Sequence, residues 1–282
     1  MDINGETQLV GIVGYDIAYT LSPALHNAAF STLRMNWVYV PLRVSRQELG
    51  TALRGVCAAG FRGFNVTIPH KVEAVSFVDE LIEPSGILGA VNTVVCAGGA
   101  MIGHNTDVEG FRSFLGEAGV PVAGSSVLLI GAGGAARAVA LALAGEGAAR
   151  IFVMNRSRER AAELAGLLKR ATPATEISVR AFDLEGSQVL RECDVAVNCT
   201  PLAEAGQLPL DYGGFAAGKW AIDLNYAKGD TVFLAEASAR EASTADGEGM
   251  LVHQAAASFR LWTGKPAPLQ EMRRAYHAAL SA

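Results

Sequence analysis

The 282-residue chain is poor in charged residues, in aromatic side chains and in cysteine. Charged residues make up 18% of it, the formal net charge is −5, and Lys and Arg do not gather into a run. We therefore expect no basic surface that could hold a phosphate backbone, and no nucleic-acid partner. No apolar run approaches the length of a membrane span, so we also expect no membrane insertion.

The four cysteines lack the spacing of a metal site. Cys57, Cys96, Cys193 and Cys199 form no CxxC pair and no Cys/His ligand pattern. The N-terminus lacks the basic region and apolar run of an export signal. These features predict reduced cysteines, no metal, and a cytoplasmic protein.

Length and composition favour a protein of two domains. The chain is longer than a common single domain, and 50% of its residues are hydrophobic. This balance is typical of compact enzymes and binding proteins rather than of disordered chains.

The first third of the chain alternates predicted strands and helices. Ser22 with Pro23, and Ser45 with Glu48, are typical helix starts, and Pro69 fits the first turn of a third helix. A hairpin and a fourth helix follow. The predicted strands are 9–14, 37–42, 63–66, 90–95 and 100–103, and the predicted helices are about 22–33, 45–59, 69–81 and 108–118. This order is typical of a sheet with helices packed on its faces.

The predicted strand 63–66 runs into a polar turn that presents Asn65, Thr67 and Lys71 at one edge. A helix cap beside a solvated lysine gives the same pattern as a catalytic edge. Thr20 and Ser22 likewise either cap a helix or hold a carboxylate at its open N–H groups.

Two later polar residues are open to the same two interpretations. Asp107 either caps the helix 108–118 or belongs to a site. Asn92 is either an ordinary strand-edge amide or a binding group.

A glycine turn follows the next buried strand. Residues 127–130 are fully apolar, and the turn Gly131-Ala132-Gly133-Gly134-Ala135-Ala136 leads into a helix from Arg137 to about Ala144, with a second strand at 150–154. A GxGxxA turn between a strand and a helix predicts dinucleotide binding, because the helix N-terminus attracts a pyrophosphate. The alternative is a tightly packed turn that binds nothing.

The second strand of this unit ends in basic residues. An NAD site usually has a carboxylate there for the ribose 2′-OH, whereas this chain has Arg156, Arg158 and Arg160. Guanidinium groups suit a 2′-phosphate, so NADP is the expected cofactor. An exposed basic turn before a helix is the alternative.

The rest of the chain continues the α/β pattern. Further strands are predicted at 177–180, 195–198 and 220–224, whose carboxyl ends should face the glycine turn. A helix at 250–263 carries Gln254 on an apolar stripe shared with Ser258, and a last helix begins near Pro268. Gln254 is either a binding residue or a core amide bonded to backbone.

Several motifs in order along the chain resemble those of the shikimate dehydrogenases, from about Gly11 to Gly264. The matching segments are Thr20-Leu21-Ser22-Pro23, Asn65-Val66-Thr67-Ile68-Pro69-His70-Lys71, Asn92-Thr93, Asn105-Thr106-Asp107, Gly131-Ala132-Gly133-Gly134-Ala135, Asn155-Arg156-Ser157, Asn198-Cys199-Thr200-Pro201-Leu202, Tyr226, and Gly249-Met250-Leu251-Val252 with Gln254.

The resemblance implies an α/β protein with an N-terminal substrate domain and a doubly wound, Rossmann-type NADP domain. The substrate domain would cover residues 1–107, completed by C-terminal helices in 247–282, and the NADP domain 108–246. The implied reaction is the reversible NADPH-dependent reduction of 3-dehydroshikimate to shikimate in aromatic amino-acid and chorismate biosynthesis.

The resemblance also implies a role for single residues. Lys71 and Asp107 match the catalytic pair. The matching substrate contacts are Thr20, Ser22, Asn65, Thr67, Lys71, Asn92, Asp107, Tyr226 and Gln254. The matching cofactor contacts are Gly131, Ala132, Gly133, Gly134, Ala135, Asn155, Arg156, Ser157, Arg160, Thr200, Leu224 and Gly247.

Two positions depart from the family pattern. Thr20 stands where serine is usual, and Ala203-Glu204 replaces the common Gly-Met. Quinate or aminoshikimate dehydrogenase activity is therefore an alternative, and a catalytically silent NADP-binding regulator is another. We expect a monomer or a homodimer.

Overall fold

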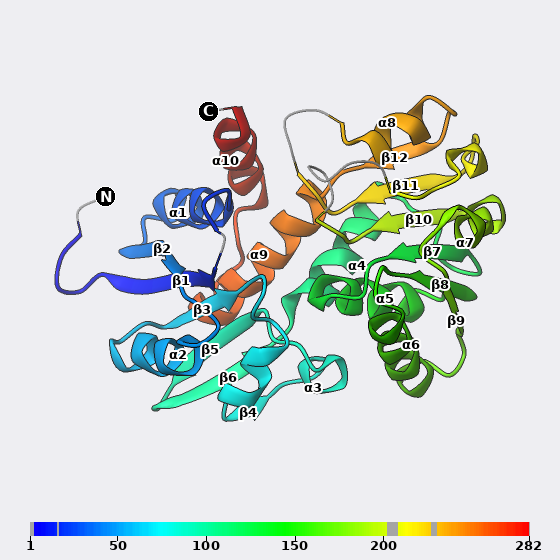
Figure 1. The fold of residues 1–282 in the computed structure, drawn as a ribbon. Coiled ribbons are helices and arrows are strands. Elements are labelled where there is room, and N and C mark those ends of the chain that lie inside the picture. The colour runs from blue at the N-terminus through cyan, green and yellow to red at the C-terminus, as the bar shows by residue number, and fades with distance from the viewer. Residues whose placement is uncertain (1–2, 16, 202–207, 227–229, 282) are drawn as a thin grey trace. The chain divides into compact units, whose positions relative to one another are not determined.

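The computed structural model describes residues 3–15, 17–201, 208–226 and 230–281 (Figure 1). The chain forms two compact units. Unit 1 comprises Met1–Gly110 and Leu251–Ala282, and unit 2 comprises Phe111–Met250. Ala203 and Glu204, at which the chain departs from the family pattern, lie outside the described residues.

Unit 1 is built on a mixed sheet of six strands in the order β2-β1-β3-β5-β6-β4. The central β3 runs parallel to β1 and antiparallel to β5. The strands are β1 (Gln8–Gly14), β2 (Trp37–Arg43), β3 (Gly63–Val66), β4 (Glu80–Leu81), β5 (Thr93–Ala97) and β6 (Ala100–His104). All four residues of β3 are buried, so the strand that carries Asn65 lies in the core of this unit.

The helices of unit 1 come from both ends of the chain. Helix α1 packs against α10, although the two are separated by most of the sequence. The helices are α1 (Ser22–Thr32), α2 (Leu49–Ala58), the 3₁₀ helix η1 (Glu73–Phe77), α3 (Ser85–Leu88) and α10 (Leu269–Ser281). Helices α4 (Thr106–Ala118) and α9 (Glu248–Thr263) each continue from one unit into the other.

The predicted helix 69–81 is wrong. Turns and the short η1 occupy this stretch, followed by β4. The Lys71 carbonyl accepts from the Val91 N–H at 2.8 Å. In a helix, this carbonyl would instead accept from an N–H four residues later in the same helix. Lys71 therefore projects from a turn fixed by tertiary hydrogen bonds.

The predicted cap residues are also wrong in detail. Helix α1 begins at Ser22 with Leu21 as its N-cap, without a side-chain cap bond. The Ser45 hydroxyl bonds to the Glu48 carboxylate at 2.7 Å, and α2 begins only at Leu49. At α4, Asn105 Oδ1 accepts from the Asp107 N–H at 3.2 Å, so Asp107 is the capped residue and not the cap.

The expectation that all four cysteines are reduced is wrong for one pair. Cys57 of α2 and Cys96 of β5 form a disulfide bond. No local sequence pattern predicts a disulfide between them, because the two residues meet only when α2 packs against the sheet. Cys193 and Cys199 are free, and burial raises the pKa of the Cys193 thiol to about 12.

Unit 2 is a sheet of six parallel strands in the order β12-β11-β10-β7-β8-β9. This is the doubly wound order, and the direction of winding reverses between β7 and β10. The strands are β7 (Ser126–Ile130), β8 (Arg150–Met154), β9 (Glu176–Arg180), β10 (Val195–Asn198), β11 (Trp220–Asp223) and β12 (Ser243–Ala245).

Helices cover the unit 2 sheet, whose central strands are buried along their whole length. Apolar residues of β7, β8, β10 and α8 form one core with those of the connecting loops. The helices are α5 (Gly134–Gly145), α6 (Arg158–Ala171), α7 (Leu184–Ser187), η2 (Gln188–Glu192), η3 (Tyr212–Gly214) and α8 (Val232–Ser238). The expected α/β class and doubly wound domain are confirmed. Within the described ranges, no helix has the length and apolarity needed to cross a bilayer.

Candidate active site

An ion pair joins the two predicted catalytic residues. Lys71 Nζ donates to Asp107 Oδ2 at 2.6 Å, with the lysine side chain 16% exposed and the aspartate side chain 4% exposed. Lys71 follows the end of β3 and Asp107 lies in the first turn of α4. The fold thus brings them together from 36 residues apart and leaves the ammonium as the part that solvent or a ligand can reach.

The second oxygen of the aspartate is held by an amide. Asn92 Nδ2 donates to Asp107 Oδ1 at 2.8 Å and to Thr106 Oγ1 at 2.9 Å. The orientation of this amide is fixed because Asn92 Oδ1 accepts from the Thr106 backbone N–H at 2.7 Å. Asn92 therefore sets the plane of the carboxylate that faces Lys71.

Asn65 is buried and bonds to the backbone of Asn92. Its Oδ1 accepts from the Tyr39 hydroxyl at 2.7 Å. Its Nδ2 donates to Asn92 O, Thr93 Oγ1 and Ser258 Oγ at 2.9 to 3.1 Å. The amide is 5% exposed, and these protein groups already use both of its N–H donors and one of the two acceptor positions of Oδ1.

Three buried hydroxyls, from Thr93, Thr106 and Ser258, meet between the two amides. We call them the hydroxyl cluster. Ser258 Oγ lies 2.8 Å from Thr93 Oγ1 and 3.1 Å from Thr106 Oγ1. Each residue is at most 3% exposed. The cluster joins β5, α4 and α9, and Asn92 links it to Asp107.

Gln254 reaches the same region from α9. Its Oε1 lies 3.5 Å from Asn92 Nδ2, and its Nε2 donates to the Leu251 carbonyl at 2.9 Å. The side chain therefore bonds to its own helix and also borders the amides. Helices α4 and α9 lie close together at this point, since a Cβ on Gly110 of α4 would lie 2.6 Å from the backbone nitrogen of Gln254 on α9.

Thr20 and Ser22 are paired at the start of α1. The Thr20 hydroxyl donates to Ser22 Oγ at 3.3 Å, and the Ser22 N–H points to Thr20 Oγ1 at 3.4 Å. Thr67 follows β3 and is half-buried, and its N–H donates to the Val13 carbonyl at 2.9 Å. Contact of these three residues with a substrate stays a prediction.

A fully buried histidine supports the Tyr39 side of the site. The His26 ring stacks on the Tyr39 ring with a centroid separation of 4.4 Å and an interplanar angle of 7°. Burial lowers the pKa of His26 to about 3. None of the described residues hydrogen-bonds to its ring nitrogens, so the imidazole is a neutral packing group.

The glycine turn of unit 2 is shaped for close backbone approach. Gly131 has a φ of +118°, a region that favours glycine. A Cβ there would lie 3.2 Å from Thr200 Cγ2, so the turn after β7 packs against the loop after β10. Gly133 is the N-cap of α5, and a Cβ there would meet open space. The backbone N–H groups at the start of α5 can thus be approached by an anion.

The basic turn after β8 is accessible. Arg156 and Arg160 are exposed. Ser157 is the N-cap of α6 and accepts from the Arg160 N–H at 3.3 Å, while Asn155 Nδ2 donates to the Ser157 carbonyl at 2.8 Å. The turn is therefore ordered by its own polar groups and presents two guanidinium groups to solvent.

A buried carboxylate holds the loops after β10 and β11. Asp223 is 1% exposed and accepts from Asn198, Thr231 and both nitrogens of Asn225 at 2.7 to 3.1 Å. Asn225 Nδ2 in turn donates to the Thr200 carbonyl at 2.9 Å. Asp223 thereby fixes the backbone around Thr200.

Three other predicted residues lie on loops of unit 2. A Cβ on Gly247 would collide with the Leu224 carbonyl, so these two predicted cofactor contacts are neighbours. Tyr226 is half-buried and follows β11. Its contact with a substrate stays a prediction.

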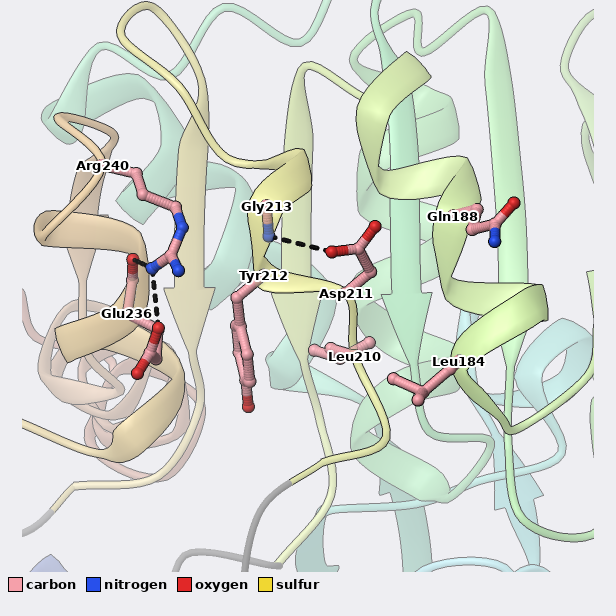
Figure 2. Close-up of a pocket in the computed structure, with 8 residues that line it drawn as sticks. All are labelled: Leu184, Gln188, Leu210, Asp211, Tyr212, Gly213, Glu236 and Arg240. Atoms are coloured by element: carbon pink, nitrogen blue, oxygen red, sulfur yellow. Dashed lines mark hydrogen bonds and ion pairs between the residues drawn. The ribbon is translucent and has the colours of Figure 1, made fainter.

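A pocket of about 380 Å³ opens elsewhere in unit 2 (Figure 2). Its charged side chains pair with protein groups: Arg240 with Glu236 at 2.6 Å, and Asp211 with the Gly213 N–H at 3.1 Å and Arg191 at 2.8 Å. The lining residues are Leu184, Gln188, Leu210, Asp211, Tyr212, Gly213, Glu236 and Arg240, none of which was predicted as a site residue.

Several of these buried groups have no role predicted from the sequence, although they hold predicted site residues in place: Tyr39, Thr93, Thr106, Ser258 and Asp223. Thr93 and Thr106 stand beside Asn92 and Asp107 in the matching motifs, and Ser258 lies one helical turn after Gln254 on the same predicted face. Tyr39 and Asp223 carry no local signal of this kind.

Models of known protein families match three segments of the chain. Residues 12–94 match the shikimate dehydrogenase substrate binding domain. Residues 116–205 match the shikimate/quinate 5-dehydrogenase family, and residues 247–275 match the shikimate 5′-dehydrogenase C-terminal domain.

Curated and solved relatives resemble the chain over nearly its whole length. It is 41% identical to the NADP⁺ shikimate dehydrogenase of Desulforamulus reducens, over 98% of this chain and 96% of that protein. The structure of Thermus thermophilus shikimate 5-dehydrogenase with NADP(H) and shikimate is 34% identical, with a TM-score of 0.86 and coverage of 97% and 100%. Corynebacterium glutamicum quinate dehydrogenase with NAD is 32% identical, with a TM-score of 0.89 and coverage of 96% and 99%.

Proposed function

Because the chain belongs to the shikimate dehydrogenase family, we propose that it catalyses the reversible NADPH-dependent reduction of 3-dehydroshikimate to shikimate, a step of aromatic amino-acid and chorismate biosynthesis. The observation that carries the proposal is the 2.6 Å pair of Lys71 and Asp107 beside buried amides.

Reduction of the carbonyl group to a hydroxyl group needs a proton for the carbonyl oxygen. When bound, NADPH supplies a hydride to the carbonyl carbon. The Lys71 ammonium donates a proton to the oxygen that gains negative charge, and takes it back in the reverse direction. Asp107 holds the amine in place, and Asn92 holds Asp107. A positioned ammonium of this kind is typical of general acid catalysis.

The remaining polar groups suit a hydroxylated ring acid. Thr20 and Ser22 offer hydroxyls for its carboxylate, and Asn65, Thr67, Tyr226 and Gln254 offer amides and hydroxyls for its ring oxygens. These roles, like that of Lys71, belong to the proposal.

Unit 2 has the features expected of an NADP site. The open backbone at Gly133 and the start of α5 suits the pyrophosphate, with Gly131, Ala132, Gly134 and Ala135 shaping the turn. Arg156 and Arg160 suit the 2′-phosphate, because a guanidinium fork matches phosphate oxygens. The loops that carry Thr200, Leu224 and Gly247 complete the proposed cofactor contacts.

Quinate is a second candidate substrate. The quinate dehydrogenase of C. glutamicum has the same fold, and Thr20 adds a methyl group where the family usually has serine. The deciding experiment measures kcat/KM for shikimate and quinate, each with NADP and with NAD. We expect the highest value for shikimate with NADP. A higher value for quinate would assign the chain to quinate oxidation, and no turnover with either acid would favour an NADP-binding regulator.

We further propose that residues 1–107 with 247–282 form the substrate domain and residues 108–246 the NADP domain. The protein would act in the cytoplasm as a monomer or homodimer. Light scattering of the purified chain and fractionation of its native cells test these two assignments.

A further inference from the structure

A buried serine bonds to one amide of the site and reaches the other through the hydroxyl cluster. Ser258 is fully buried on α9 and lies 193 residues from Asn65 in the sequence. Its hydroxyl accepts from Asn65 Nδ2 at 3.0 Å, and it bonds back to the Gln254 carbonyl at 3.0 Å. One side chain thereby ties β3 to the helix that carries Gln254.

The same hydroxyl reaches Asn92 through the other two members of the hydroxyl cluster. Thr93 Oγ1 donates to Asn92 Oδ1 at 3.0 Å, and Asn92 Nδ2 donates to Thr106 Oγ1 at 2.9 Å. Ser258 contacts both threonines. Ser258 thus supports the two hydroxyls that flank Asn92, and the Thr106 backbone N–H orients the same amide from its other side.

The path ends at the ion pair. Asn92 fixes one oxygen of Asp107, and Asp107 fixes the Lys71 amine by the other. In a buried network, losing the Ser258 hydroxyl leaves Asn65, Thr93 and Thr106 with one hydrogen-bond partner fewer, and the remaining groups shift to replace the lost bond. A rotated Asn92 amide no longer donates to the carboxylate.

We propose that Ser258 is a positioning residue for catalysis, which orients Asn65 and, through Thr93 and Thr106, Asn92 and the Lys71–Asp107 pair. The inference rests on the proposed function for its kinetic effect. Its structural effect, on the Asn92 amide, does not depend on the identity of the substrate.

The kinetic test compares Ser258→Ala with the wild type in the oxidation of shikimate by NADP. We expect kcat to fall about 10- to 100-fold, because small misplacement of reacting groups has effects of this order. The matched control is Thr263→Ala, on the same helix, whose hydroxyl makes the same kind of bond to the carbonyl four residues earlier at 2.8 Å. Its kcat and KM should stay at wild-type values. A Ser258→Ala enzyme with unchanged kcat and KM would overturn the inference, whatever its thermal stability.

A double-mutant cycle tests whether the cluster acts as a unit. Thr93→Val removes a second hydroxyl with little change in volume. If both hydroxyls act through Asn92, the kcat of the double variant should be no lower than that of the less active single variant. Losses that multiply would mean independent roles and would overturn the shared path.

A measurement without turnover separates this inference from the proposed reaction. The side-chain amide protons of Asn92, followed by ¹H–¹⁵N NMR, should exchange with solvent faster in Ser258→Ala than in the wild type or Thr263→Ala. Unchanged exchange and chemical shift would contradict the positioning role. An inactive wild type that gives the expected NMR response would reject the proposed reaction and retain the role of Ser258.

Discussion

Asn92 and Asp107 form a hydrogen bond of 2.8 Å on the carboxylate oxygen that Lys71 does not contact. Each oxygen of Asp107 thus has its own partner, one charged and one neutral. The carboxylate cannot turn without breaking a bond to one of them. This arrangement keeps the ammonium at a fixed place beside the buried amides.

Removing the amine should abolish most of the activity. We expect Lys71→Ala to lower kcat about 10²- to 10⁴-fold, the usual contribution of a general acid or base. Steady-state rates with shikimate and NADP provide the measurement. Lys265→Ala, at an exposed lysine of unit 1, is the control and should keep the wild-type rate. A near-normal kcat for Lys71→Ala would remove Lys71 from the mechanism.

The basic turn after β8 should discriminate between cofactors. Arg156→Ala should weaken NADP binding roughly 10- to 100-fold, the equivalent of losing one charge-assisted hydrogen bond, and leave NAD binding nearly unchanged. Titration calorimetry with both cofactors measures the ratio. Arg170→Ala, near the far end of α6, should change neither value. Equal losses for NADP and NAD would reject a 2′-phosphate contact.

The disulfide should raise the free energy of unfolding and lower the number of reactive thiols. Denatured protein prepared without reductant should show two reactive thiols, from Cys193 and Cys199, and reduced protein should show four. Reduction should lower the free energy of unfolding by about 2–4 kcal/mol, the usual contribution of a disulfide. Urea unfolding with and without reductant measures this. The Cys57→Ser/Cys96→Ser variant should not respond to reductant, and four thiols without reductant would contradict the bond.

The buried His26 predicts a loss of stability in weak acid. Its pKa is about 3 in the folded protein and 6.5 ordinarily. The unfolded chain therefore binds more protons between these values, so the contribution is fully present above pH 6.5 and is lost as pH falls. The expected loss between pH 7 and pH 5 is about 2 kcal/mol.

Urea unfolding at these two pH values tests the prediction. His26→Phe, which keeps an aromatic ring against Tyr39, should flatten the pH dependence. His277→Phe, at an exposed position of α10, should not. An equally steep dependence in His26→Phe would assign the acid sensitivity to other groups.

Local patterns in the sequence predicted the parts of the fold that depend on neighbouring residues. The strand β7, the turn at Gly131 and the helix α5 follow one another directly, so apolar periodicity and glycine spacing locate all three. The arginines at the end of β8 are likewise visible in a short window.

Groups whose partners are distant in sequence could not be predicted in this way. Ser258 reads as an ordinary small residue of an apolar helix until the fold places it beside Asn65. Cys57 and Cys96 meet for the same reason, through packing of α2 on the sheet. The turn at Lys71 was predicted as helix because its decisive bond, to the Val91 N–H, is equally invisible in a local window.

Helix α4 passes so close to α9 at Gly110 that this position has no room for a side chain. Any side chain at position 110 would strike the backbone of Gln254 and displace α9, together with the serine one turn further along. In the Thr20 loop, the Thr20 hydroxyl bonds to Ser22 at the start of α1. Under the proposed function, a substitution in that loop would change contacts with the substrate and would leave the crossing of α4 and α9 in place.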